Sequence, residues 1–182
     1  ASMLRAEAMQ RLGIPFEVIP SNFDEDTIKA GSVDEIITAI AKGKADVLAR
    51  AYPDCLVVTA DSNNVFEDKS YGKPKSLEQA REWLQRMRGK TQEFHTALVL
   101  TLGSVKRQTV DVNISYITFK NFSDEEIDSY FASVNPLDKA IGWAPEGPGL
   151  TLLDEFRGEP GSEFALPLDT LRKRLREFGV GL

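Results

Sequence analysis

Cysteine and histidine are almost absent from this chain, which has one of each, Cys55 and His95, among 182 residues. A lone cysteine excludes an internal disulfide and a cysteine-based zinc site, and one histidine cannot assemble a zinc cluster by itself. A single cysteine suits a reducing compartment, so we expect a cytoplasmic protein. Cys55 opens an apolar run, and we expect its thiol to be buried there as a small hydrophobic group.

Long apolar runs and an excess of basic charge are also missing. No apolar run approaches the length that crosses a bilayer, and no signal peptide is visible. The chain has 28 Asp and Glu against 22 Lys and Arg, a net charge of −6. This balance argues against a general nucleic-acid binder, because nucleic acids are bound by basic surfaces. We therefore expect neither a nucleic acid nor a membrane as partner, although a metal and a few local cations can still bind a phosphate compound.

Three common catalytic motifs are missing as well. There is no glycine-rich phosphate loop ending in Lys-Ser or Lys-Thr, no G-x-G-x-x-G motif and no G-x-S-x-G elbow. His95 lies in the strand-like run FHTALVL and is interpreted as a partly buried strand residue rather than a catalytic base. The chemistry-bearing residues that remain are Arg5, Glu25, Lys44, Asp61, Lys73 and, in a Gly- and Pro-rich loop, Glu146.

Helical and strand patterns alternate along the chain and predict an α/β fold, a twisted mixed β-sheet with helices on both faces. We expect a single domain over residues 1–182. Whether this domain forms two lobes around a central cleft is a question that the sequence leaves open. Helices are expected over residues 4–12, 33–51, 77–88, 124–133 and 168–178. Strands are expected over residues 15–20, 55–60, 92–102, 108–119 and 150–156, with a hairpin over 64–69.

Lys44 interrupts the apolar face of the predicted helix 33–51. At about 100° per residue, the apolar face takes in Ile37, Ile40, Ala41, Val47 and Ala51 among others, and Lys44 falls inside it, whereas Lys42 points the opposite way. Such a lysine either extends its ammonium to the rim or meets an anion. Asp61, at the end of the predicted strand 55–60, favours the second placement, in which Lys44 contacts an anion. The reason is that ligands of α/β sheets bind beyond the carboxyl ends of strands. The pair would hold a metal and a polyphosphate.

We also expect Lys44→Met to keep or raise thermal stability, since it removes a partly buried charge.

The segments GIPFEVIPSNFDE, AKGKADVLARAYPDCLVVTAD, YGKPKSLEQA, FSDEEIDSYFAS and NPLDKA follow one another along the chain. In order and spacing they resemble the Maf family of nucleotide pyrophosphatases over nearly the whole chain. The resemblance implies a fold similar to the inosine-triphosphate pyrophosphatases. It also implies hydrolysis of a nucleoside triphosphate to a monophosphate and pyrophosphate with a divalent metal, Mg²⁺ or Mn²⁺. The sequence leaves a homodimer open.

The resemblance assigns a role to each charged residue. Ser2 and Arg5 match a phosphate-binding motif, and the start of a helix favours phosphate there. Glu25 and Asp61 would bind the metal, and Asp61 would orient or deprotonate the attacking water. Lys44 and Lys73 would offset the charge that develops on the triphosphate. Taken singly, Arg5 and Lys73 are better interpreted as solvated surface charges and Glu25 as a turn residue. Taken together, in this order, the residues favour the functional interpretation.

Base selection is expected in the loop AIGWAPEG. Glu146 resembles the branch of the family that acts on 7-methyl-GTP, where a carboxylate accepts from guanine and matches its cationic ring. Trp143 would supply a stacking face or, with equal weight, cover the core as a loop residue. Lys139 resembles instead the dTTP/UTP branch, which has a glutamine at the position of Glu146. The expected substrate is 7-methyl-GTP or a related nucleotide, with dTTP and UTP as the alternative.

A different class of function stays open. Met3, Leu4 and Ala6 depart from the family pattern around Arg5, where a proline and further basic or aromatic residues are usual. With these departures, the protein could bind nucleotides with little turnover and regulate cell division, as the older association of the family with septum formation suggests.

Overall fold

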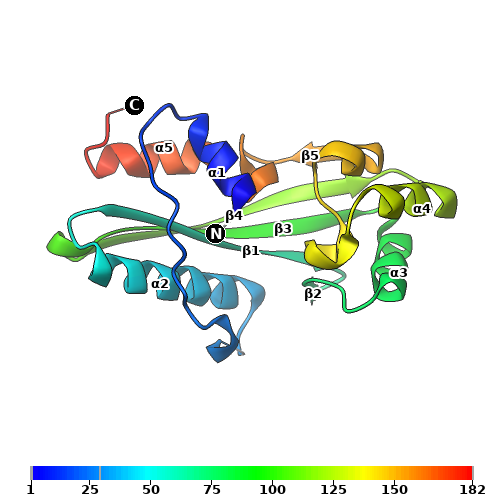
Figure 1. Ribbon diagram of the computed structural model, residues 1–182, viewed down its shortest axis with the longest axis horizontal. Coiled ribbons are helices and arrows are strands. Elements are labelled where there is room, and N and C mark those ends of the chain that lie inside the picture. Colours follow the sequence, from blue (N-terminus) through cyan, green and yellow to red (C-terminus); the bar gives the residue numbers. More distant parts are fainter. Residues whose placement is uncertain (1, 29, 182) are drawn as a thin grey trace. The chain divides into compact units, whose positions relative to one another are not determined.

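The computed structural model describes residues 2–28 and 30–181 (Figure 1). Its helices are α1 (Met3–Gln10), α2 (Val33–Ala51), α3 (Leu77–Met87), α4 (Asp124–Ser133) and α5 (Leu168–Glu177). Its strands are β1 (Leu56–Phe66), β2 (Lys69–Tyr71), β3 (Thr91–Leu102), β4 (Arg107–Phe119) and β5 (Leu153–Arg157). They form one five-stranded sheet in the order β2-β1-β3-β4-β5, in which β1 and β2 and also β4 and β5 run antiparallel. The predicted α/β class is confirmed.

The chain divides into two compact units. The first comprises Ala1–Ser62, His95–Asn113 and Glu159–Leu182, and the second comprises Asn63–Phe94 and Ile114–Gly158. The strands β1, β3 and β4 each pass from one unit into the other. The expected single domain with a central cleft stays a prediction. Among residues 2–28 and 30–181, none of the helices has the length and apolar character that a bilayer crossing needs.

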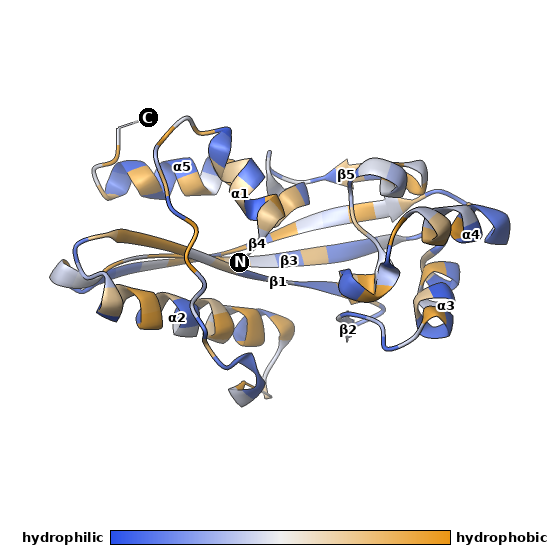
Figure 2. Ribbon diagram, in the orientation of Figure 1, coloured by the Kyte–Doolittle hydropathy of each residue, from blue (hydrophilic) through white to orange (hydrophobic). Residues whose placement is uncertain are grey.

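In the first unit, α2 covers one face of the sheet and α1 and α5 cover the other (Figure 1). The alternation of side chains along β3 explains this, because successive residues of a strand point to opposite faces. Ala97 and Val99 pack with α2, whereas Leu98 and Leu100 pack in the cluster that contains Leu171 of α5. Apolar and polar residues alternate in bands along α2 and α5, as amphipathic helices require (Figure 2).

Helix α2 begins where the sequence predicts, but its buried face is rotated. Ser32 and Glu35 form the reciprocal capping box. The helix packs through Ile37, Ala41 and Ala45, whereas Val47 is 40% exposed, so its placement on the buried face was wrong. Spacing by four residues gives one continuous ridge, and the small alanines let the helix lie close to the sheet.

The segment predicted as a strand over residues 15–20 has no regular secondary structure. It runs as an irregular connection from α1 to a short 3₁₀ turn, Glu25–Thr27, before α2 (Figure 1). Pro15 and Pro20 lack the N–H donors that a strand ladder uses. Val18 is 50% exposed, which shows that the apolar alternation of this segment does not lead to burial.

Strand β1 is longer than predicted and places Asp61 in its interior rather than at its end. The polar run after Asp61 lowered the expected strand propensity, since Asp and Asn are depleted in strands. The chain turns only at Glu67 and Asp68, which both have positive φ and join Phe66 to Lys69 of β2. The prediction that Cys55 is buried was wrong, because it lies exposed before the strand.

The second unit has its own aromatic core. Leu84 and Met87 of α3, Ile127 and Tyr130 of α4 and Phe119 of β4 contribute to one buried cluster. The Tyr130 hydroxyl accepts a hydrogen bond from the backbone N–H of Ala144, and burial raises the pKa of this phenol to about 12. A 3₁₀ helix, Gly147–Thr151, occupies the start of the strand predicted over residues 150–156.

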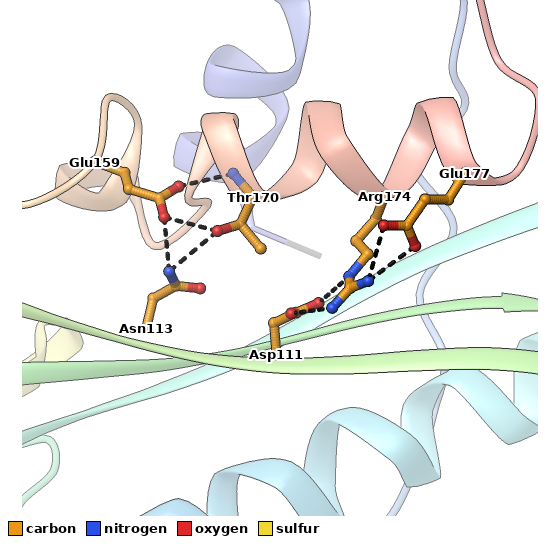
Figure 3. Close-up of polar contacts among 6 residues, drawn as sticks. All are labelled: Asp111, Asn113, Glu159, Thr170, Arg174 and Glu177. Carbon is orange, nitrogen blue, oxygen red and sulfur yellow. Dashed lines mark hydrogen bonds and ion pairs between the residues drawn. The ribbon is translucent and has the colours of Figure 1, made fainter.

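Helix α5 is fastened to β4 within the first unit (Figure 3). Arg174 donates to both carboxylate oxygens of Asp111, at 2.8 and 2.6 Å, and also to Glu177. The carboxylate of Glu159 accepts from the side chain of Asn113 at 2.9 Å and from the Thr170 backbone at 2.8 Å. These contacts fix the last helix of the chain on the sheet.

Candidate functional site

Lys44 lies between two carboxylates in the first unit. Its Nζ is 2.8 Å from Oδ1 of Asp61 and 2.8 Å from Oε1 of Glu25. The side chains of Lys44 and Asp61 are 17% and 15% exposed, and that of Glu25 is 54% exposed. Of the two placements that the sequence allows for Lys44, the structure shows the ammonium meeting anions.

Local structure explains why these three residues meet. Strand alternation directs Thr59 and Asp61 to the same face of β1, and the Thr59 hydroxyl donates to the carbonyl of Ala41 in α2 at 2.8 Å. Ala41 is one turn before Lys44, so the helix and the strand are joined directly beside the ion pair. Glu25 opens the 3₁₀ turn that precedes α2.

Burial and the neighbouring cations have opposite effects on the pKa of Asp61. Burial raises the pKa of Asp61 above its ordinary value of 3.8, while the hydrogen bond and charge of Lys44 and the charge of Arg5 lower it. Burial lowers the pKa of Arg5, and the negative charges of Asp61 and Glu25 raise it. A carboxylate that is a stronger base than usual therefore lies close to two cations.

Arg5 is fixed by contacts that the sequence did not reveal. Ser2 caps α1, and its hydroxyl accepts from the backbone N–H of Arg5 at 3.4 Å. In the side chain of Arg5, Nε donates to the carbonyl of Ala165 at 3.1 Å and Nη2 donates to the hydroxyl of Ser62 at 3.2 Å. Ser62 was detectable as the hydroxyl next to Asp61, but Ala165 is 160 residues from Arg5 and carries no chemical signal.

The carboxylates of Glu25 and Asp61 fit a divalent cation. Both place an oxygen at the same distance from a single positive centre, the Lys44 ammonium. Magnesium bound to phosphates usually takes one or two carboxylates, with water and phosphate completing its ligands. Within residues 2–28 and 30–181, no cluster of three or more Asp, Glu, His or Cys could hold a metal. Glu25 and Asp61 match the number of carboxylates that magnesium bound to phosphates takes.

The other predicted site residues belong to the second unit. Lys73 and Glu146 are exposed. Trp143 is 5% exposed, donates from Nε1 to the carbonyl of Gly149 at 2.9 Å and meets Phe119 edge-on. This placement favours the alternative in which Trp143 covers the core over its role as a stacking face. The participation of Lys73 and Glu146 in one site with Asp61 stays a prediction.

His95 is a buried strand residue, as expected. It is 7% exposed on β3, and its Nδ1 lies 2.6 Å from Oδ1 of Asp34 at the start of α2. This contact joins the helix to the sheet within the first unit.

Comparisons with known proteins now identify the family. The family model described as Maf-like protein matches residues 1–178. The chain is 35% identical over 179 residues to a dTTP/UTP pyrophosphatase of Syntrophus aciditrophicus (strain SB), covering 98% of this chain and 87% of the relative. It is 33% identical over 177 residues to a dTTP/UTP pyrophosphatase of Bacillus thuringiensis subsp. konkukian, with 97% and 91% covered. A dTTP/UTP pyrophosphatase of Bacillus cytotoxicus is 32% identical, with 97% and 92% covered.

These matches extend along nearly the whole chain and agree with the predicted enzyme class, a pyrophosphatase of nucleoside triphosphates, which is confirmed at the level of the family. The names of the relatives do not support the branch that Glu146 suggested, and they agree with the alternative, dTTP and UTP. Both the family model and the relatives lead to the same assignment: the chain belongs to the Maf-like protein family.

Proposed function

We propose that this chain is a metal-dependent pyrophosphatase that converts dTTP and UTP to their monophosphates and pyrophosphate. The names of its relatives support the substrate class. The observation that carries the proposal is the pairing of Lys44 with both Glu25 and Asp61 at 2.8 Å, which gathers a base, a cation and a metal-binding pair in one place.

Each residue then has a role in the hydrolysis. Asp61 accepts the proton of the attacking water at its carboxylate, and its burial makes it a stronger base than an exposed aspartate. The Lys44 ammonium and the Arg5 guanidinium stabilise the negative charge that grows on the phosphate oxygens as the anhydride bond breaks. The leaving group is pyrophosphate, and the water oxygen remains on the nucleoside monophosphate.

Glu25 and Asp61 would hold the divalent metal. When bound, the metal would neutralise phosphate charge and lower the pKa of bound water. Lys44 would then exchange its contact with these carboxylates for one with the phosphates. Lys73 is proposed as a further cation for the triphosphate, on the strength of the GKP segment alone.

Product analysis tests the proposal. The protein is incubated with dTTP, UTP, CTP, GTP and 7-methyl-GTP in Mg²⁺ or Mn²⁺, and pyrophosphate and monophosphate are measured. We expect dTTP and UTP to give both products in equal amounts and EDTA to stop the reaction. Release of orthophosphate, or a faster reaction with 7-methyl-GTP than with UTP, would contradict the proposal. Binding without turnover of any nucleotide would favour a regulator instead.

Substitution of Glu146 tests how the base is selected. The uracil edge offers both a donor and an acceptor, and a glutamate can match only the donor, whereas a glutamine matches both. We expect Glu146→Gln to raise kcat/KM for UTP relative to 7-methyl-GTP by about tenfold, since a bidentate contact to a base edge discriminates by about 1–3 kcal/mol. The matched control is Glu82→Gln on the exposed side of α3. An unchanged ratio in Glu146→Gln would remove this residue from base selection.

A further inference from the structure

The guanidinium of Arg5 is held on two of its three nitrogens. Nε donates to the carbonyl of Ala165 and Nη2 donates to the hydroxyl of Ser62, at 3.1 and 3.2 Å. Nη1 donates to no atom in the described parts of the chain, and it is not among the fully buried atoms that lack a partner. One edge of the guanidinium is therefore fixed by protein, and the remaining nitrogen is available to a ligand.

The hydroxyl that holds Nη2 is itself held. Ser62 Oγ lies 3.0 Å from the hydroxyl of Thr96 on the neighbouring strand β3, and Thr96 is 1% exposed. A hydroxyl has one donor and two acceptor positions, so Ser62 can accept from Arg5 while it shares a proton with Thr96. Thr96 cannot turn to water, and the orientation of Ser62 is thereby restricted.

The backbone partner of Arg5 is also conformationally fixed. Ala165 has φ of 59°, in the left-handed region that alanine rarely adopts. The Ala165 N–H donates to the carbonyl of Ser162 and closes a turn. The carbonyl of Ala165, which accepts from Arg5, is held in place by this turn. Rigid partners on both sides of the guanidinium reduce the side-chain freedom that binding would otherwise remove.

We propose that Ser62 and Thr96 are positioning residues that act through Arg5 and direct its Nη1 toward a phosphate of the bound nucleotide. The inference rests on the proposed function for the identity of that ligand. Donors already oriented before the reaction stabilise developing charge more effectively than donors that must reorganise. The hydroxyl pair thus contributes to catalysis without touching the substrate.

A double-mutant cycle tests the proposal. We expect Ser62→Ala to lower kcat/KM for UTP about tenfold, because a hydrogen bond to a charged group is lost. Thr96→Val should have a smaller effect, since the contact of Ser62 with Arg5 remains. In an Arg5→Met background, Ser62→Ala should change kcat/KM by less than about twofold, because the group through which it acts is gone.

Conservative variants and a matched pair supply the controls. Ser62→Thr and Thr96→Ser keep both hydroxyls and should retain activity. Thr118→Val breaks another hydroxyl pair, with Thr91 at 2.9 Å, which has no hydrogen bond with an arginine of residues 2–28 and 30–181, and it should leave activity unchanged. Thermal unfolding of every variant checks that the fold is kept.

Binding of inorganic tripolyphosphate, measured by calorimetry, separates this proposal from the proposed function. Suppose that no nucleotide is hydrolysed, but Ser62→Ala weakens tripolyphosphate binding only when Arg5 is present. The proposed function then fails and the positioning role stands. Equal losses from Ser62→Ala in the presence and absence of Arg5 would overturn the positioning role. Tripolyphosphate binding that does not depend on Arg5, or no binding by the unmutated protein, would also overturn it.

Discussion

Asp61→Asn is expected to lower pyrophosphate release by about 10²–10⁴-fold, the range that general-base catalysis contributes. The change removes the proposed proton acceptor, which is also a proposed metal ligand, at nearly constant shape. The fold should be kept with only a modest loss of stability, because the amide has nearly the same shape and Lys44 keeps its contact with Glu25. Steady-state rates with UTP and thermal unfolding measure the two effects. Asp54→Asn, at an exposed aspartate just before β1, is the matched control and should retain full activity.

The pH profile gives an independent measure of Asp61. Burial raises the pKa of Asp61, so kcat/KM should fall on acidification at a higher pH than an aspartate with the ordinary value of 3.8 would give. For stability the sign is opposite, because the folded state binds the proton more tightly. The contribution of Asp61 to folding is largest below 3.8 and is lost as the pH rises through its raised pKa. An acid limb at or below 3.8 would argue against Asp61 as the base.

Lys44→Met is expected to lower activity at least 100-fold and to destabilise the protein by about 1–3 kcal/mol. The sequence alone suggested that stability would be kept or raised, as relief of a partly buried charge. The structure reverses this expectation, because Lys44 is the counter-charge of Asp61, whose side chain is 15% exposed. Removing one partner leaves an uncompensated carboxylate. The loss should be smaller than for a fully buried pair, since Glu25 is 54% exposed.

Urea unfolding at neutral and acidic pH tests this explanation. The destabilisation by Lys44→Met should shrink on acidification, because a protonated Asp61 needs no counter-charge. Lys42→Met is the matched control, two residues away on the exposed side of α2, and should change neither stability nor turnover. A Lys44→Met variant as stable as the unmutated protein would show that the ion pair does not support the fold.

Features encoded by neighbouring residues were predictable from the sequence. Helices α2 and α4 begin at the predicted residues 33 and 124. Each has a capping box, Ser32 with Glu35 and Ser123 with Glu126, whose two residues are three positions apart and so can be recognised in the sequence. The periodicity of α2 also identified Lys44, even though the buried face was rotated. Helical spacing fixes which residues share a face, whereas the face that packs depends on the sheet beneath it.

Features that depend on distant partners were not predictable. The segment over residues 15–20 alternates like a strand, but pairing requires a neighbouring strand and N–H donors that Pro15 and Pro20 lack. The end of β1 was placed at Asp61 because the polar run that follows is unusual in strands. The hydrogen bond from Arg5 to Ala165 joins residues 160 positions apart. Its acceptor is a backbone carbonyl, which any residue type could supply.

The fastening of α5 to β4 has a consequence for the order in which the chain can fold during synthesis. The second unit is complete once Gly158 has been made, whereas the first unit needs residues from both ends of the chain. Until Leu171 and Leu175 arrive, the apolar face of β3 that carries Leu98 and Leu100 has no helix α5 to cover it. Arg5 likewise lacks Ala165 until that stage. A nascent chain therefore exposes the apolar strand face of Leu98 and Leu100 to aggregation, and leaves Arg5 without its contact to Ala165, until helix α5 has left the ribosome.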